Sequence, residues 1–176
     1  SSGNIRVKGH LISNDANGWA GGSCGSWAYV VLTGADDQQI SGTGKWANLS
    51  VSKPSGYVLM SSNVDIISGG NLSGTALAQM KNYPGRFRTM GNATINYAGL
   101  VDDVEFQGNG TITVSQNLNV NDSLVLTSVN IIGNCSNGNI LVKGNLVSND
   151  ATAWASGSCG SWAYVVLNGS GNQTVS

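Results

Sequence analysis

The sequence predicts an all-β fold, a right-handed parallel β-helix (β-solenoid) that carries a long 135-residue tandem repeat. Three observations predict this fold. One stretch of sequence returns at a fixed distance, short runs alternate apolar with polar residues, and turn-forming residues separate those runs.

The repeat is the strongest of the three observations. Residues 3–41 return at residues 138–176, so the period is the step from Gly3 to Gly138. The run 23–32 recurs letter for letter as residues 158–167. A period that holds over this length is typical of a repeat architecture.

The short runs predict strands that are buried on one face. Alternation over such runs is the pattern of half-buried strands, and Gly, Asn, Asp and Ser stand between the runs as turn residues. A shorter echo relates residues 112–114 to residues 140–142. Equivalent residues one coil apart lie about 4.8 Å apart, so we expect these two runs to stack as like on like.

The period also sets the expected domain organisation. Residues 1–135 form one full solenoid repeat, and residues 136–176 start the next repeat. Residues 69–90 break the alternation, because residues 75–81 could form a short helical turn and a basic, proline-containing segment follows. We expect residues 69–90 to be a loop or excursion that covers an apolar edge or binds a partner.

Composition excludes several classes of protein. Charged residues make up 10% of the chain and the net charge is −1, so no basic patch is available for nucleic acid. The chain contains no run of about 18 apolar residues, so no membrane span is expected. A low charge with abundant Asn, Ser, Thr and Gly is common in secreted bacterial surface proteins, and we expect an extracellular or cell-surface location in a bacterium.

A family resemblance lies in residues 31–42, 45–53, 56–59 and, in the second copy, 166–176. These stretches resemble repeats of very large bacterial cell-surface (adhesin-like) proteins. In those β-solenoids a Leu-x-Gly segment, a Gln-x-Ile-Ser-Gly turn and an Asn-Leu-x-Val strand alternate. The resemblance implies the architecture and the location, and it implies no ligand.

The three cysteines predict one disulfide bond within the chain. Cys135 precedes Cys159 by about one coil, whereas Cys24 and Cys159 are equivalents a full period apart. We expect Cys135 to bond Cys159 and Cys24 to bond a residue outside the chain, which implies an oxidising compartment. Unpaired buried cysteines and a bond from Cys24 to Cys135 of another copy remain as alternatives.

Catalytic chemistry has few candidates. Glycoside cleavage uses two carboxylates that face one cleft, and the best group is Asp102, Asp103 and Glu105, where Asp103 and Glu105 would share a strand face. The single histidine, His10, is Asn145 in the second copy. We therefore expect no enzyme, no catalytic residue and no cofactor.

Two further sets of residues could bind a ligand. Asp15, Asp122 and Asp150 follow asparagines in matching turns and are weak candidates for Ca²⁺, although such residues also cap turns. Aromatic residues that could stack on a glycan recur in both copies: Trp19, Trp27, Tyr29, Trp154, Trp162 and Tyr164. Only Thr111 and Thr113 resemble an ordered threonine pair, so an ice-binding rank of threonines is not expected.

The expected function is a structural repeat segment of an extracellular surface protein or fibre, acting as a rigid stalk, spacer or filament body. A carbohydrate-binding adhesin module is the alternative, and a glycan-degrading β-helix enzyme is the second. The expected partners are further copies of the same repeat, in one chain or end to end, and glycans.

Overall fold

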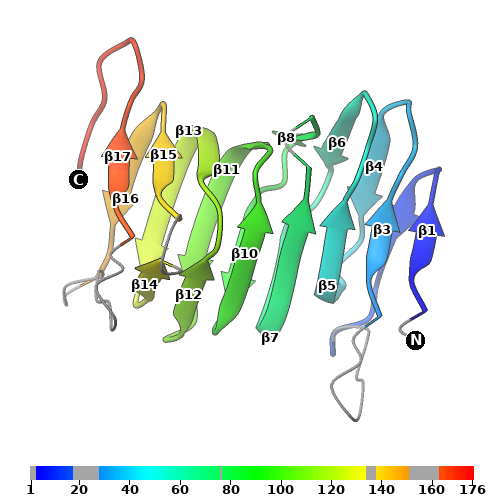
Figure 1. Cartoon of the computed structure of the whole chain (residues 1–176). Coiled ribbons are helices and arrows are strands. Elements are labelled where there is room, and N and C mark those ends of the chain that lie inside the picture. Colours follow the sequence, from blue (N-terminus) through cyan, green and yellow to red (C-terminus); the bar gives the residue numbers. More distant parts are fainter. Residues whose placement is uncertain (1–2, 18–27, 76, 134–137, 151–162) are drawn as a thin grey trace.

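The computed structural model describes residues 3–17, 28–75, 77–133, 138–150 and 163–176. These residues form 17 strands and no helix, and all strand pairs are parallel within one wound sheet. The strands follow one another in a row, with the two termini at opposite ends of it (Figure 1). The predicted all-β parallel solenoid is therefore confirmed. No helix long and apolar enough to cross a membrane occurs in this part of the chain.

The strands stack in three ladders, which we call sides 1, 2 and 3. Side 1 consists of β1 (Ile5–Val7), β3 (Val30–Leu32), the second half of β5 (Lys45–Val51), the second half of β7 (Val64–Gly74), β10 (Ala93–Tyr97), β12 (Thr111–Val114) and β14 (Asn130–Gly133).

Side 2 consists of β2 (Leu11–Ile12), β4 (Gln38–Ser41), β6 (Tyr57–Met60), β8 (Gln79–Asn82), the start of β11 (Leu100–Gln107), the start of β13 (Leu118–Thr127), β15 (Ile140–Val142) and β17 (Val165–Leu167).

Side 3 consists of the first halves of β5 and β7, β9 (Phe87–Met90), the remaining parts of β11 and β13, β16 (Asn145–Ser148) and a bridge from Leu146 to Val175. The long strands β5, β7, β11 and β13 thus continue around a corner from one side to the next.

Coil length varies along the rod because the corners differ in size. The coil that leads from Thr89 to its in-register neighbour Phe106 is short, whereas the coil that leads from Leu11 to its neighbour Ile40 is long. The strands stay paired in parallel although the coils differ in length. The sides are therefore the constant part of the fold and the corners are the variable part.

The core is one hydrophobic cluster filled from all three sides. Each side contributes inward residues that stack in register, and almost all of them are fully buried. On side 1 the main rank is Val30, Leu49, Leu72, Ile95 and Val114; on side 2 it is Val58, Met80, Val101, Val120 and Val142; on side 3 it is Val64, Phe87, Val104, Leu124 and Leu146.

The expectation that residues 69–90 leave the rod is wrong for the described residues of that segment. They contribute the end of β7, all of β8 and all of β9, and Met80 lies fully buried between Val58 and Val101. The Tyr97 hydroxyl donates a hydrogen bond to the Ala78 carbonyl at 2.7 Å. Burial in a ladder overrides the helix-forming composition of this segment.

The expected stacking of the shorter echo is also wrong. Ile112 lies beside Ile131 on side 1, whereas Ile140 lies beside Leu118 on side 2. Equivalent residues therefore occupy neighbouring sides, because the step from Ile112 to Ile140 corresponds to one coil plus one side.

Candidate functional site

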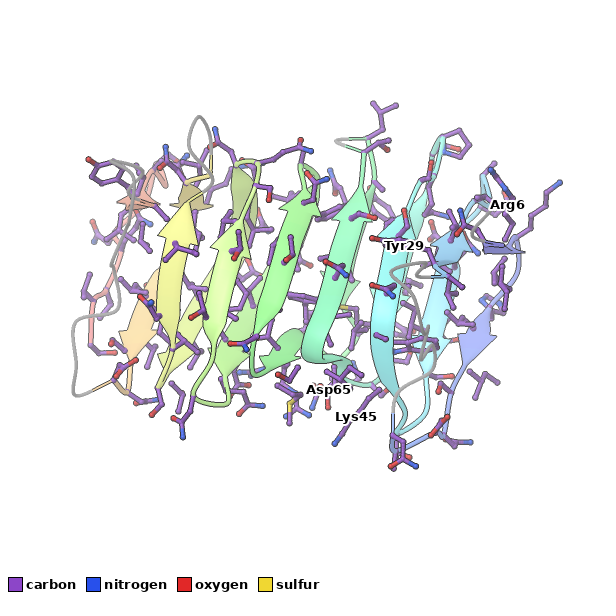
Figure 2. All side chains as sticks on the ribbon, turned by 60° about the horizontal axis from the view of Figure 1, so that its bottom comes forward. Arg6, Tyr29, Lys45 and Asp65 are labelled. Atoms are coloured by element: carbon purple, nitrogen blue, oxygen red, sulfur yellow. The ribbon has the colours of Figure 1, made fainter. Side chains whose placement is uncertain are left out.

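Two of the six aromatic residues predicted to stack on glycans lie in the described part of the chain. Tyr29 is half-buried, whereas Tyr164 is 60% exposed. The Tyr29 N–H donates to Asn4 Oδ1 at 3.1 Å, and the Tyr164 N–H donates to Asn139 Oδ1 at the same distance. Figure 2 shows Tyr29 toward the N-terminal end of the rod. The other four aromatic residues lie outside the described residues: Trp19, Trp27, Trp154 and Trp162.

The predicted disulfide also concerns residues outside the described ranges. Cys24, Cys135 and Cys159 all belong to those segments. The pairing of Cys135 with Cys159 stays a prediction.

Corner residues bond across coils. At several corners an asparagine or aspartate oxygen accepts the backbone N–H of the neighbouring coil, as in Asn92 Oδ1 with Thr111 N at 2.7 Å and Asp37 Oδ1 with Tyr57 N at 2.8 Å. These bonds satisfy N–H groups at the points where a ladder ends. The sequence pattern shows that these are turn residues, but not that they bond the next coil.

His10 makes one of these bonds. Its Nδ1 accepts the Gln39 N–H at 3.0 Å, and in the second copy Asn145 Oδ1 accepts the Thr174 N–H at 2.9 Å. The imidazole and the amide thus perform the same task at equivalent positions. This contact explains how an asparagine can replace the histidine.

A glutamine joins coils in both copies. Gln38 is fully buried, and its Nε2 donates to the carbonyls of Val7 at 3.0 Å and Gly9 at 2.6 Å. Gln173 donates in the same way to the carbonyls of Val142 at 2.9 Å and Gly144 at 2.6 Å. These contacts explain why a glutamine stands at the first position of the Gln-x-Ile-Ser-Gly turn.

Lys53 completes this arrangement in the first copy. It is 1% exposed, and its Nζ donates to the Gly34 carbonyl at 2.8 Å, the Asp36 carbonyl at 2.7 Å and Gln38 Oε1 at 3.0 Å. Burial lowers the pKa of Lys53, and the charges of Asp37 and Asp36 partly offset this. The ammonium closes a loop and is fully hydrogen-bonded, which fits a structural role.

The three carboxylates considered for catalysis all bond neighbouring coils. Asp103 is 9% exposed, and its carboxylate accepts from Asn82 Nδ2 at 2.5 Å and from the Ser123 hydroxyl. Asp102 accepts the Asn82 N–H at 3.2 Å, and Glu105 lies 3.6 Å from Arg86 Nη1. A register shift between Val101 and Asp103 separates the two halves of β11. Each carboxylate is thus engaged in joining coils.

The three calcium candidates lie in different surroundings. Asp15 Oδ1 accepts the Asn17 N–H at 2.9 Å, and Asp150 Oδ2 accepts the Val129 N–H at 2.8 Å. Asp122 lies near Asp102 and Asp103, and its pKa is raised first by burial and then by their negative charges. In the part of the chain that the structure describes, no three His, Cys, Asp or Glu residues form a group that could hold a metal ion.

Side 3 carries a column of alternating charge. Lys45, Asp65, Arg88 and Glu105 follow one another in register on consecutive coils. Arg88 donates to both oxygens of Asp65 at 2.7 Å, and this hydrogen bonding raises the pKa of Arg88. Lys45 and Asp65 lie next to each other along one edge of the rod (Figure 2). Attraction between neighbouring charges adds to the bonding between coils.

The residues of side 1 that alternate with the inward rank are uncharged over several coils, and Asn48 among them is buried. Asn48, Asn71, Thr94 and Thr113 stack in register, and the Asn71 amide donates to Asn48 Oδ1 at 2.6 Å. The sequence pairs Thr113 only with Thr111, because no local pattern indicates that Thr94 lies beside Thr113. A shallow depression of about 260 Å³ lies here, lined by Gly69, Gly70, Asn92, Ala93, Thr94, Thr111 and Thr113.

Comparisons with known proteins give no relative for this chain. No family model, no curated protein and no solved structure matches it. A function for this chain therefore has to be inferred from its own residues.

Proposed function

We propose that this chain is a structural repeat segment of an extracellular surface protein or fibre and acts as a rigid stalk, spacer or filament body. The observation that carries the proposal is a single hydrophobic core that is stacked in register from coil to coil along the described rod.

The inward ranks keep the same geometry from coil to coil. Val30 and Leu49 lie in register on side 1, and Leu124 and Leu146 lie in register on side 3. Because each coil presents the same kinds of strand to the next, further coils of the same repeat would continue the ladders and lengthen the rod.

Imaging of concatenated repeats tests this proposal. Arrays that repeat residues 3–137 once, twice or three times before residues 138–176 should be rods that lengthen by about 30 Å per added unit, since coils stack at about 4.8 Å. Small-angle scattering gives the same increment in solution. Particles that stay compact, or that gain no length with added units, would contradict a stalk or filament.

The extracellular location is the second part of the proposal. The low charge of the chain and the resemblance of residues 31–42, 45–53, 56–59 and 166–176 support it. Peptide mapping of the natural protein without reductant should recover Cys135 linked to Cys159. Free thiols at both positions would contradict the disulfide, and the extracellular location would then lose the support of an oxidising compartment.

Carbohydrate binding is the second candidate function, and the exposure of Tyr164 favours it. Sugar rings pack their apolar faces on exposed aromatic rings. A glycan array should then show binding that Tyr164→Ala or Trp19→Ala weakens, while Tyr164→Phe retains it. Glycan cleavage has no comparable support, because Asp103 and Glu105 are engaged by different partners on the neighbouring coils.

A further inference from the structure

Residues one period apart make the same local contacts. Ile5 pairs with Val30 in the first copy, and Ile140 pairs with Val165 in the second, where both residues lie one period later. The contacts of Gln38 recur in Gln173 in the same way. The copies nevertheless lie on different sides of the rod.

The strand ladders give the size of this displacement. From β1, side 1 continues through β3, β5, β7, β10 and β12 to β14, which is six steps of one coil each. The next strand along the chain is β15, the equivalent of β1, and it belongs to side 2. One period is therefore six coils plus one side.

A second ladder gives the same result independently. From β2, side 2 continues through β4, β6, β8, β11 and β13 to β15, again six steps. The next strand, β16, is the equivalent of β2 and belongs to side 3. The shorter echo behaves alike, since it advances one coil plus one side.

The sides are interchangeable for a physical reason. Each side needs only a short parallel strand with apolar residues inward and a polar corner that bonds the next coil. Nothing in this requirement distinguishes one side from another. A duplicated segment can therefore join the rod on any side that keeps the chain winding.

We propose that an array of these repeats displays each equivalent surface on the three sides in succession, one side further per repeat. The inference rests on the proposed array. A given surface returns to the same side after three repeats, which is about 90 Å of rod at about 4.8 Å per coil. Surfaces such as the one around Tyr164 then point in three directions.

This display favours a partner that reaches the rod from several directions. A flat partner laid along one side would contact each equivalent surface only once in three repeats. A partner that surrounds the rod, by contrast, could engage every repeat. The repeat thus suits attachment within a surrounding layer more than adhesion to a plane.

Paired cysteines in the present chain test the displacement. Neighbouring strands place in-register Cα atoms about 4.8 Å apart, within the range that a disulfide bridges. Asn119→Cys with Leu141→Cys should cross-link under mild oxidation, because these residues are in register on side 2. Thr113→Cys with Leu141→Cys, a pair related by the shorter echo, should not, whereas stacking of like on like would require it. All three positions are partly exposed, so the variants keep the core.

Matched controls make the test decisive. Thr113→Cys with Ile132→Cys is in register on side 1 and should cross-link, which shows that Thr113→Cys is reactive. Arg6→Cys with Val31→Cys should also cross-link, because β1 and β3 are neighbours in the first copy. Peptide mapping separates engineered links from any that involve native cysteines. A link between positions 113 and 141, or none between 119 and 141, would overturn the displacement.

Array images separate this inference from the proposed function. A gold label at Tyr164→Cys and its equivalents should advance by one third of a turn per repeat along a rod. A straight row of labels would overturn the three-sided display while leaving the stalk intact. Absence of any rod would contradict the stalk, whatever the cysteine pairs show.

Discussion

In the first copy of the repeat, β1 and β2 lie at the outer end of the described rod, and Ile5 is 45% exposed. In the second copy the equivalent residue, Ile140, is fully buried against Leu118 of the coil before it. The opposite holds for the later strands, where Ile40 is 1% exposed and its equivalent, Val175, is 62% exposed. The first copy is thus exposed at its first strands and buried at its later ones, and the second copy shows the reverse.

This difference shows that the local bonds of the repeat do not depend on its neighbours, whereas its burial does. Gln38 and Gln173 make the same contacts although different coils adjoin them. The same inward side chain should therefore contribute differently to stability at different positions in the rod. The following substitutions test that contrast.

Removing an inward side chain should show the largest contrast. Ile140→Ala should lower the free energy of unfolding by about 3 kcal/mol, because it leaves a cavity in the core. Ile5→Ala, the same change in the first copy, should cost about 1 kcal/mol, because much of Ile5 already contacts solvent. Urea denaturation followed by tryptophan fluorescence measures both values. Equal losses would show that end coils are as well covered as inner coils.

Adding a methyl group at an equivalent glycine should give the next contrast. A Cβ on Gly144 would lie 1.6 Å from the Asp122 carbonyl oxygen, whereas a Cβ on Gly9 would meet nothing within 4 Å. Gly144→Ala should cost about 2 kcal/mol or more, because the two backbones must separate. Gly9→Ala should change stability by less than about 0.5 kcal/mol. Thermal denaturation measures both variants, and matching transitions would contradict the close approach at Gly144.

The charge of Asp122, in the coil before the second copy, should have a smaller and pH-dependent effect on stability. The pKa of Asp122 is raised in the folded chain, so ionisation of Asp122 opposes folding at neutral pH. Asp122→Asn should raise the melting temperature at pH 7. The gain should disappear as the pH falls below the ordinary aspartate value, about 3.9, where the unfolded chain is also protonated. A gain that persists at pH 3 would point to packing and not to charge.

The smallest effect is expected at His10, where the second copy has a different side chain, Asn145, that makes the same hydrogen bond. His10→Asn should leave the melting temperature unchanged, because Asn145 already makes the equivalent bond. His10→Ala should lower it slightly, since the Gln39 N–H then loses its acceptor. A loss with His10→Asn as large as with His10→Ala would show that the imidazole has another task.

Sequence patterns predicted the type of coil well because alternation reports which face of a strand is buried. The apolar runs around Val58, Ile95 and Val120 all became inward ranks. Residues 69–90 differ from the expectation because the composition of residues 75–81 favours a helical turn, whereas Met80 and Phe87 gain more by filling the core. Local composition cannot report that gain, which depends on Val58 and Val104 in other coils.

The relation between repeats and sides lay beyond sequence reasoning for a different reason. The step from Ile112 to Ile140 is close enough to one coil to be mistaken for one, and only the register of Ile112 with Ile131 shows the extra side. The same limit applied to the candidate sites. Asp103 and Glu105 alternate along the chain, but their partners lie on other coils that no local pattern identifies.

The corner bonds carry a consequence for the conditions that the rod can withstand. In the part of the chain that the structure describes, most of their acceptors are amide oxygens, as in Asn4, Asn92, Asn117 and Asn139. An amide neither gains nor loses a proton over the ordinary pH range, and its short-range bonds are weakened little by dissolved salt. The corner bonds that amides accept should therefore persist in brine and in dilute acid, unlike the charged contact between Arg88 and Asp65, which salt screens.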